Sequence, residues 1–254
     1  MSTTQKIALV TGGSRGLGKD MALSLAEEGL DVIITYNSKK EEALAVVEEI
    51  EKAGQKAAAL QLNTGEVKSF EGFFGQLAEV LKNTFDTDHF DFLVNNAGIG
   101  INSSFAETTE DTFDQLLNIQ FKGVFFLAQK ALPLINDGGG IVNISTGLTR
   151  FTNPGFAAYA SMKGAIETLT MYQAKELGAR GIRVNTVAPG AIETDFGGGV
   201  VRDNEHVNKH IAGITALGRV GRADDIGSVV AFLCTDKAKW INSQRIEVSG
   251  GMNL

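Results

Sequence analysis

Cysteine and proline are scarce in this sequence, with one and three residues respectively among 254. The single Cys234 cannot form an internal disulfide, and because it follows the apolar run 229–233 we expect a buried, unreactive thiol in a protein of the reducing cytoplasm. The prolines are scattered rather than gathered into a linker, which favours a single domain spanning residues 1–254.

Long apolar runs and an excess of basic residues are also missing. No stretch approaches the roughly 18 apolar residues that a spanning helix needs, so no membrane segment is expected. Acidic residues outnumber basic ones by 30 to 23, which gives a formal charge of −7. A general nucleic-acid binder needs a basic face to displace counterions from phosphate, so this class of protein is excluded. No metal site is expected.

Short apolar runs alternate with longer segments whose apolar residues recur at helical spacing. Strands are expected at residues 7–10, 32–35, 57–62, 90–94, 140–144, 183–187 and 245–248. Helices are expected at residues 16–29, 39–53, 66–83, 110–135, 157–179 and 223–234. This alternation predicts an α/β fold built from βαβ units on a parallel sheet.

Two segments fall outside this alternation. Residues 84–89 are polar and are expected to form a loop before the fourth strand. Residues 191–215 are rich in glycine and poor in apolar side chains, and they follow the sixth strand. Because mobile segments over a site tend to be glycine-hinged loops, this second segment is predicted to be a loop that serves as a substrate lid.

A glycine-rich loop, Thr-Gly-Gly-Ser-Arg-Gly-Leu-Gly, connects the first expected strand to the first expected helix. Gly12 lets the chain turn off the strand, Gly16 lets backbone approach a pyrophosphate, and Gly18 allows the helix to pack closely. The helix N-terminus then favours the anion. The loop is therefore predicted to bind a dinucleotide, with candidate ligands Gly12, Ser14, Arg15, Gly16 and Gly18.

The end of the second strand indicates which dinucleotide is bound. A carboxylate there would bind the ribose 2′-hydroxyl and repel a 2′-phosphate, but residues 35–40 read Thr-Tyr-Asn-Ser-Lys-Lys and contain no acid. Arg15, Asn37 and Ser38 offer donors that suit a 2′-phosphate, so NADP(H) is favoured over NAD(H). The two lysines are either further donors or a solvated helix start.

Tyr159 and Lys163 are four residues apart, so on a helix they share one face. By itself this spacing is equally compatible with a buried tyrosine beside a surface lysine. The expected strand 140–144, however, ends just before Ser145 and Thr146, at the edge where open parallel sheets bind ligands. One of these two hydroxyls is therefore expected near Tyr159.

Six motifs follow one another along the chain at fitting intervals. They are the glycine loop at 11–18, Asn95-Asn96-Ala97-Gly98, Asn118, Tyr159 with Lys163, Pro189-Gly190 and the final Val248-Ser249-Gly250-Gly251. Together they resemble the short-chain dehydrogenase/reductase family, and most closely its bacterial 3-oxoacyl-(acyl-carrier-protein) reductase-like branch. The resemblance covers nearly the whole chain. It implies a Rossmann-type α/β/α sandwich, with a doubly wound parallel sheet of seven strands in the order 3-2-1-4-5-6-7.

The resemblance also implies a chemistry, in which hydride from a nicotinamide reduces a carbonyl and Tyr159 acts as general acid. Lys163 would hold the nicotinamide ribose and, with the oxidised nicotinamide, lower the pKa of the phenol. Asn118 resembles the residue that holds a water linking the lysine to solvent, although it could simply kink its helix. Thr146 stands where the family usually has a substrate-orienting serine, and strand alternation turns Ser145 to the opposite side.

Further cofactor contacts implied by the resemblance lie at strand ends. Asn63 and Thr64 are expected at the adenine, Asn96, Ala97 and Gly98 at the adenine-side ribose, and Pro189, Gly190, Ile192 and Thr194 at the nicotinamide. Some of these positions also have an ordinary structural explanation, such as an Asn-Ala-Gly turn.

The predicted function is NADPH-dependent reduction of a ketone, most closely of a 3-oxoacyl thioester in fatty acid biosynthesis. A sugar, steroid or xenobiotic alcohol dehydrogenase of the same family is an alternative, as is a non-catalytic NADP(H)-binding sensor or scaffold. An acyl carrier protein would require a basic surface near the site, for which Lys122, Lys130 and Lys175 are scattered candidates. Helices 110–135, with Phe121, Phe125 and Phe126, and 157–179 would pair subunits of a homodimer or homotetramer.

Overall fold

The structure is a computed structural model that describes residues 5–254. Seven parallel strands form one sheet in the order β3-β2-β1-β4-β5-β6-β7, which confirms the predicted order. The strands are β1 (Ile7–Val10), β2 (Asp31–Tyr36), β3 (Ala57–Gln61), β4 (Phe90–Asn95), β5 (Ile135–Ile144), β6 (Arg183–Pro189) and β7 (Arg245–Val248). Each strand is connected to the next strand along the chain by a crossover, as parallel strands require.

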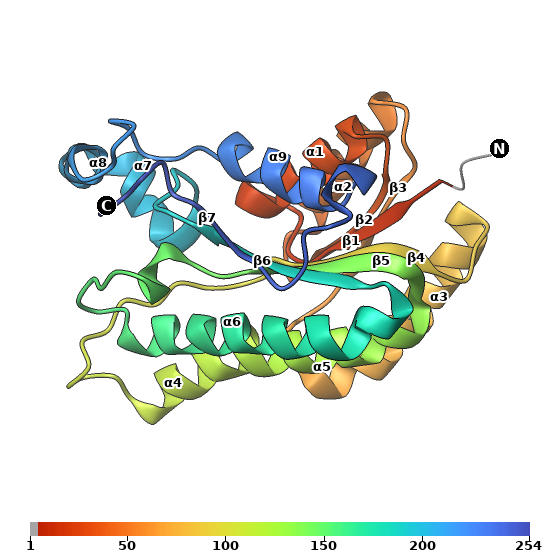
Figure 1. Cartoon of the computed structure of the whole chain (residues 1–254), viewed down its shortest axis with the longest axis horizontal. Helices are drawn as coiled ribbons and strands as arrows, with labels where there is room; N and C mark the ends of the chain where they lie inside the picture. The colour runs from red at the N-terminus through yellow and green to blue at the C-terminus, as the bar shows by residue number, and fades with distance from the viewer. Residues whose placement is uncertain (1–4) are drawn as a thin grey trace.

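Helices cover both faces of the sheet (Figure 1). One face carries α1 (Gly16–Glu27), α2 (Lys40–Lys52) and α9 (Asp224–Leu233), and the other carries α3 (Phe70–Phe85), α4 (Glu110–Leu117), α5 (Gly123–Ala131) and α6 (Ala157–Leu177). The short helices α7 (Val200–Asp203) and α8 (Glu205–Gly213) lie apart from these layers. Short 3-10 turns occur at Val67–Ser69, Leu132–Leu134, Gly147–Thr149, Gly178–Arg180, Phe196–Gly199 and Asp236–Ala238. No helix within residues 5–254 is both long and apolar enough to cross a membrane.

Strand β1 lies in the middle of the sheet, and its side chains belong to both halves of the core. Ala8 and Val10 belong to the apolar cluster that includes residues of α1 and α9. Ile7 and Leu9 belong to the cluster that includes residues of α3 and α5. Because alternate residues point to opposite faces, a central parallel strand must be apolar throughout, and this explains the continuous run seen in the sequence.

The long helix expected over residues 110–135 is interrupted and ends earlier. A π-helical turn, Asn118–Lys122, separates α4 from α5, and single-turn π-helices of this kind are frequent at functional sites. A Cβ at Gly123 would collide with the Thr64 carbonyl oxygen, so glycine is required where the helix passes this strand end. The helix ends at Ala131 before a proline-containing 3-10 turn, and β5 consequently begins at Ile135 rather than at residue 140.

The expectation that residues 191–215 form a loop is wrong, because this segment contains α7 and α8. Asn204 caps α8, since its side chain accepts a hydrogen bond from the backbone of Val207 at 3.1 Å, and Ile211 is buried beneath the helix. The glycine hinge is present at residues 197–199, where φ is 63°, 80° and 76°. Only glycine adopts three consecutive left-handed conformations readily. Residues 84–89 also differ slightly from expectation, because α3 continues to Phe85.

Candidate active site

The glycine loop after β1 is held against the turn that follows β4. The Thr11 hydroxyl accepts hydrogen bonds from the backbone of Asn96 and Ala97, both at 3.0 Å. The Asn96 amide in turn donates to the carbonyls of Thr11 and Gly12, at 2.9 and 3.2 Å. A Cβ at Gly18 would collide with the Gly12 carbonyl, so the first helical turn can pack onto the loop only with glycine there. The loop is thus already shaped before any ligand arrives.

The region predicted to contact the 2′-phosphate and adenine lies at the ends of β2 and β3. Asn37 and Ser38 are exposed, and no carboxylate occupies the end of β2. Asn63 is exposed and accepts a hydrogen bond from the backbone of Gly65 at 3.0 Å. Lys39 pairs with Glu42 at 3.1 Å, as a lysine at a solvated helix start would. The exposed donors and the missing acid fit a phosphorylated ribose.

Arg15 is exposed at the start of α1, with its Nη1 3.4 Å from the carboxylate of Asp195. The same carboxylate accepts a hydrogen bond from Arg202 at 2.5 Å. Thr194 is buried beside Gly16, since a Cβ on that glycine would lie 3.6 Å from the Thr194 Cβ. The segment after β6 therefore lies against the glycine loop, although the two are about 180 residues apart in sequence.

Tyr159, Lys163 and Thr146 lie together at the carboxyl edge of the sheet. Tyr159 and Lys163 are 7% and 4% exposed, so the surface-lysine alternative does not describe this chain. Lys163 Nζ donates to the Ile144 carbonyl at 2.8 Å and lies 5.8 Å from the centroid of the Tyr159 ring. The Thr146 hydroxyl accepts from the backbone of Leu148 at 3.3 Å and lies close enough to the phenol to influence the pKa of Tyr159.

Burial controls the protonation of both titratable side chains. It raises the pKa of Tyr159 above its usual value, and the hydrogen bond from Thr146 opposes this rise only in part. Burial also lowers the pKa of Lys163 to about 7. This rise concerns the protein alone, whereas the lowering expected from the sequence depends on Lys163 together with a bound oxidised nicotinamide. Tyr159 is consequently protonated at neutral pH, which is the state that a proton donor needs.

Ser145 is turned away from Tyr159. Its hydroxyl donates to Glu167 at 2.7 Å and approaches the Lys163 carbonyl at 3.4 Å. Glu167 is itself paired with Arg245 at 2.8 Å. The two neighbouring hydroxyls therefore have different partners, and Thr146 is the one that contacts the phenol.

Asn118 is the first residue of the π-helical turn and is half-buried, and its carbonyl accepts the Gly123 N–H. The fully buried residue of this turn is Gln120, which the sequence analysis overlooked. Its amide donates to the Ile99 carbonyl, while its Oε1 lies against Gly98 and has no partner within the described chain. Its burial was signalled in the sequence by the position of a lone glutamine in an apolar stretch of helix.

Replacing Gln120 by leucine is expected to loosen the 96–98 turn, because the Ile99 carbonyl loses its donor. We expect KM for NADPH to rise several-fold, with a smaller change in kcat. The measurement is steady-state kinetics with NADPH varied, with Gln115→Leu on the exposed surface of α4 as the control. An unchanged KM for NADPH would show that this amide serves folding alone.

Apolar side chains surround Tyr159. Leu116 and Met162 are buried with it, and the partly buried side chains packed on this cluster are Ile99, Ile101, Leu117, Phe121, Leu148, Phe156 and Ala158. The rings of Phe156 and Phe196 lie 6.3 and 6.0 Å from the Tyr159 ring. A side chain at Gly100 would collide with Phe196, so glycine provides the space for this ring. The Tyr159 side chain thus lies among apolar side chains, with two aromatic rings beside it.

Known proteins resemble the chain over almost its whole length. The family model described as Enoyl-(Acyl carrier protein) reductase matches residues 12–253. The 3-oxoacyl-(acyl-carrier-protein) reductase FabG of Staphylococcus aureus is 39% identical over 251 residues, which are 98% of each chain. These matches agree with the motifs found in the sequence.

Solved structures share the fold, and two of those described below hold NADP. The promiscuous reductase LugOII, described as catalysing keto-reduction, is 38% identical with a TM-score of 0.94 over 99% of each chain. The angucycline C-6 ketoreductase LanV with bound NADP is 35% identical with a TM-score of 0.93, over 98% of this chain and 95% of that one. A short-chain dehydrogenase from Burkholderia cenocepacia in complex with NADP is 36% identical with a TM-score of 0.90, over 99% of each chain.

Proposed function

Because the chain belongs to the short-chain dehydrogenase/reductase family, we propose that it reduces the ketone of a 3-oxoacyl thioester to a secondary alcohol. It is an oxidoreductase of this family, and its cofactor is NADP(H). The observation that carries the proposal is the burial of Tyr159 and Lys163 side by side at the carboxyl edge of the sheet, with Lys163 Nζ 5.8 Å from the Tyr159 ring and Thr146 next to the phenol. The Staphylococcus aureus relative supports the choice of a thioester.

When bound, the reduced nicotinamide supplies the hydride. Tyr159 donates its hydroxyl proton to the carbonyl oxygen as negative charge develops there. Thr146 Oγ1 accepts a hydrogen bond from Leu148, and with substrate bound its own proton can be donated to the same carbonyl oxygen instead of to Tyr159. The glycine loop holds the pyrophosphate at the N-terminus of α1, while Arg15, Asn37 and Ser38 bind the 2′-phosphate.

Lys163 is held within the site by the Ile144 carbonyl. We assign it to the ribose hydroxyls of the nicotinamide, and the remaining strand-end residues Asn63, Thr64, Asn96, Ala97 and Gly98 to the adenosine half. Pro189, Gly190, Ile192 and Thr194 then border the nicotinamide. The half-buried Asn118 is assigned to the water path that returns a proton to the site.

The experiment that tests the function is NADPH oxidation with acetoacetyl-CoA. We expect turnover with this thioester, and little with NADH because no acid at the end of β2 binds a free ribose 2′-hydroxyl. Sugar, steroid and simple aliphatic ketones in the same assay address the other dehydrogenase activities of the family. A protein that binds NADPH but leaves every ketone unreduced would instead be a sensor or scaffold.

A fused-ring aromatic ketone is a second candidate substrate, and the Phe156 and Phe196 rings beside Tyr159 favour it. Aromatic faces and edges bind flat rings well. The likeness to an angucycline ketoreductase points the same way. A bicyclic ketone such as 1-tetralone, assayed beside acetoacetyl-CoA, discriminates the two, since the preferred class should show the higher kcat/KM.

We further propose that the subunits pair through the face formed by α4, α5 and α6. This face exposes Phe113, Phe125, Met171 and Tyr172, which are 41%, 37%, 52% and 63% exposed. Large exposed apolar side chains concentrated on neighbouring helices are typical of subunit interfaces. Light scattering of the purified protein tests whether it is a homodimer or a homotetramer.

Lys122, Lys130 and Lys175 are also exposed, and they are the proposed contacts for an acyl carrier protein.

A further inference from the structure

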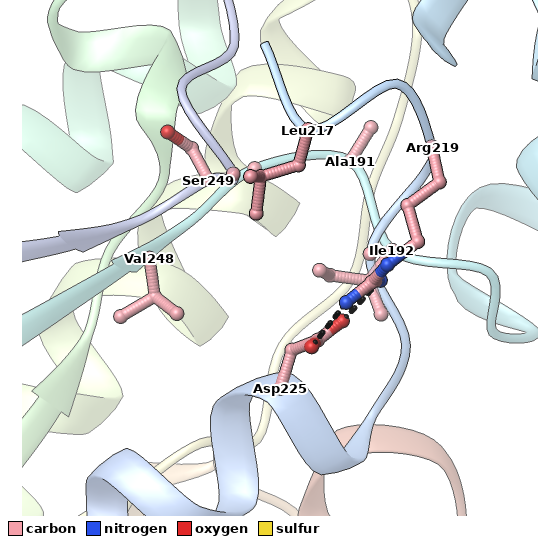
Figure 2. A pocket seen from close by; sticks show the side chains of 10 residues that line it. Ala191, Ile192, Leu217, Arg219, Asp225, Val248 and Ser249 are labelled. Atoms are coloured by element: carbon pink, nitrogen blue, oxygen red, sulfur yellow. Dashed lines mark hydrogen bonds and ion pairs between the residues drawn. The ribbon is translucent and has the colours of Figure 1, made fainter. Parts of the chain in front are cut away.

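A small cavity of about 130 Å³ lies behind the segment that follows β6 (Figure 2). Its walls come from three stretches of chain, namely 190–192, 217–221 and 248–250, together with Asp225 at the start of α9. The side chains of Arg219 and Asp225 meet at one end of the cavity, next to Ile192 (Figure 2). The mechanism proposed above does not use this ion pair.

Arg219 and Asp225 form a bidentate pair, with Nη1 and Nη2 at 2.6 and 2.7 Å from the two carboxylate oxygens. Arg219 Nη1 also donates to the Val220 carbonyl at 3.0 Å, and Asp225 accepts from the backbone of Arg222 at 2.8 Å. The hydrogen bonds from Arg219 lower the pKa of Asp225 to about 2, so the pair stays charged at neutral pH. Loop 219–222 is thus tied to its own ion pair by two backbone hydrogen bonds.

Loop 219–222 is hydrogen-bonded to the segment after β6 that is predicted to border the nicotinamide. The Gly221 N–H donates to the Ala191 carbonyl at 2.9 Å, and the Glu193 N–H donates to the Gly221 carbonyl at 3.0 Å. Ile192 and Gly221 therefore form a parallel bridge, and a side chain at Gly221 would collide with Ile192. Thr194 follows directly and lies against the glycine loop.

We propose that the Arg219–Asp225 pair is a positioning device for the nicotinamide half of the cofactor. Arg219 and Asp225 fix the backbone of Val220 and Arg222 on either side of Gly221. Gly221 in turn holds the backbone on both sides of Ile192, whose carbonyl accepts the Thr194 N–H at 2.9 Å. The proposal rests on the proposed function in placing the nicotinamide beside Ile192 and Thr194. An exposed ion pair contributes little to stability, but a displacement of about 1 Å beside a reacting group lowers rates by as much as 10²-fold.

The test compares two ligands of the full-length protein. Adenosine 2′,5′-bisphosphate occupies only the adenosine half of the site, whereas NADPH also reaches the nicotinamide half. In Arg219→Ala we expect the affinity for NADPH to fall about 10-fold, measured by calorimetry, with the affinity for the bisphosphate unchanged. The exchange of charges in Arg219→Asp with Asp225→Arg is expected to restore part of the lost NADPH affinity.

Arg180→Ala is the matched control. Arg180 pairs with Asp137 at 2.7 Å and donates to the Leu132 and Ile135 carbonyls, but it lies at the opposite edge of the sheet, before β6 begins. Its loss should leave NADPH affinity unchanged.

The proposal is overturned if Arg219→Ala weakens NADPH and the bisphosphate equally, if it changes neither affinity, or if the charge exchange restores nothing. Failure of the proposed function gives a different result. A wild-type protein that reduces no ketone, but whose NADPH affinity still falls selectively in Arg219→Ala, would refute the assigned reaction and leave the positioning role intact.

Discussion

Replacing Tyr159 by phenylalanine is expected to lower kcat/KM for ketone reduction about 10³-fold, the effect of removing a general acid. The ring of Phe fills the same space between Phe156 and Phe196, so the apolar pocket keeps its shape. Only the phenol hydroxyl, which lies beside Thr146, is lost. NADPH affinity should therefore change by less than about 3-fold, and the defect should appear in kcat. Single-turnover NADPH oxidation, with binding measured separately, checks both expectations.

Tyr172→Phe on the same helix is the control. Tyr172 is 63% exposed and belongs to the proposed subunit interface rather than to the site, so loss of its hydroxyl should leave kcat unchanged. A Tyr159→Phe protein that retained most of its activity would mean that another group donates the proton. Since Thr146 is the hydroxyl that contacts Tyr159, the double variant with Thr146→Val would then identify it.

The order of the sheet could be predicted because its signal is distributed along the whole chain. A central strand such as β1 must be apolar on both faces. Each of the six expected helical regions is marked by apolar residues that recur at helical spacing. The ends of individual helices and strands were harder to predict where they depend on a single turn or register shift. The end of α5 depends on a 3-10 turn at Leu132–Leu134. The early start of β5 depends on the pairing of Ile135 with Phe90, which is followed by a register shift before Gly140 pairs with Phe92.

Those parts of the candidate site could be predicted whose relative positions follow from the number of residues between them. Four residues on a helix place Tyr159 and Lys163 on one face, and strand alternation separates Ser145 from Thr146. Gln120 was missed because its burial results from the π-helical turn, which rotates the following residues relative to a regular helix. The rise that burial causes in the Tyr159 pKa was not foreseen, because burial cannot be measured from the sequence.

Replacing Lys163 by methionine is expected to lower kcat/KM by about 10³-fold or more, because in the proposed mechanism one side chain serves both the cofactor ribose and the region of the phenol. Unlike Tyr159→Phe, this variant should also bind NADPH more weakly. Lys163 is 4% exposed and its ammonium has one hydrogen bond, to Ile144. Methionine fits the same volume without a charge, so the fold should be retained. The exposed Lys175→Met on the same helix is the control for both measurements.

The same variant is expected to be more stable than the wild type at low pH, with a sign that follows from proton linkage. Burial lowers the pKa of Lys163 from 10.5 to about 7, so between these values the unfolded chain binds more protons than the folded one. Wild-type stability therefore rises with pH across this window, and the cost of the buried charge, up to about 5 kcal/mol, is complete below it. Methionine has no such cost. The stability advantage of Lys163→Met in urea unfolding should thus be largest near about pH 6 and shrink toward about pH 10, whereas an advantage independent of pH would mean that Lys163 is not buried in its charged form.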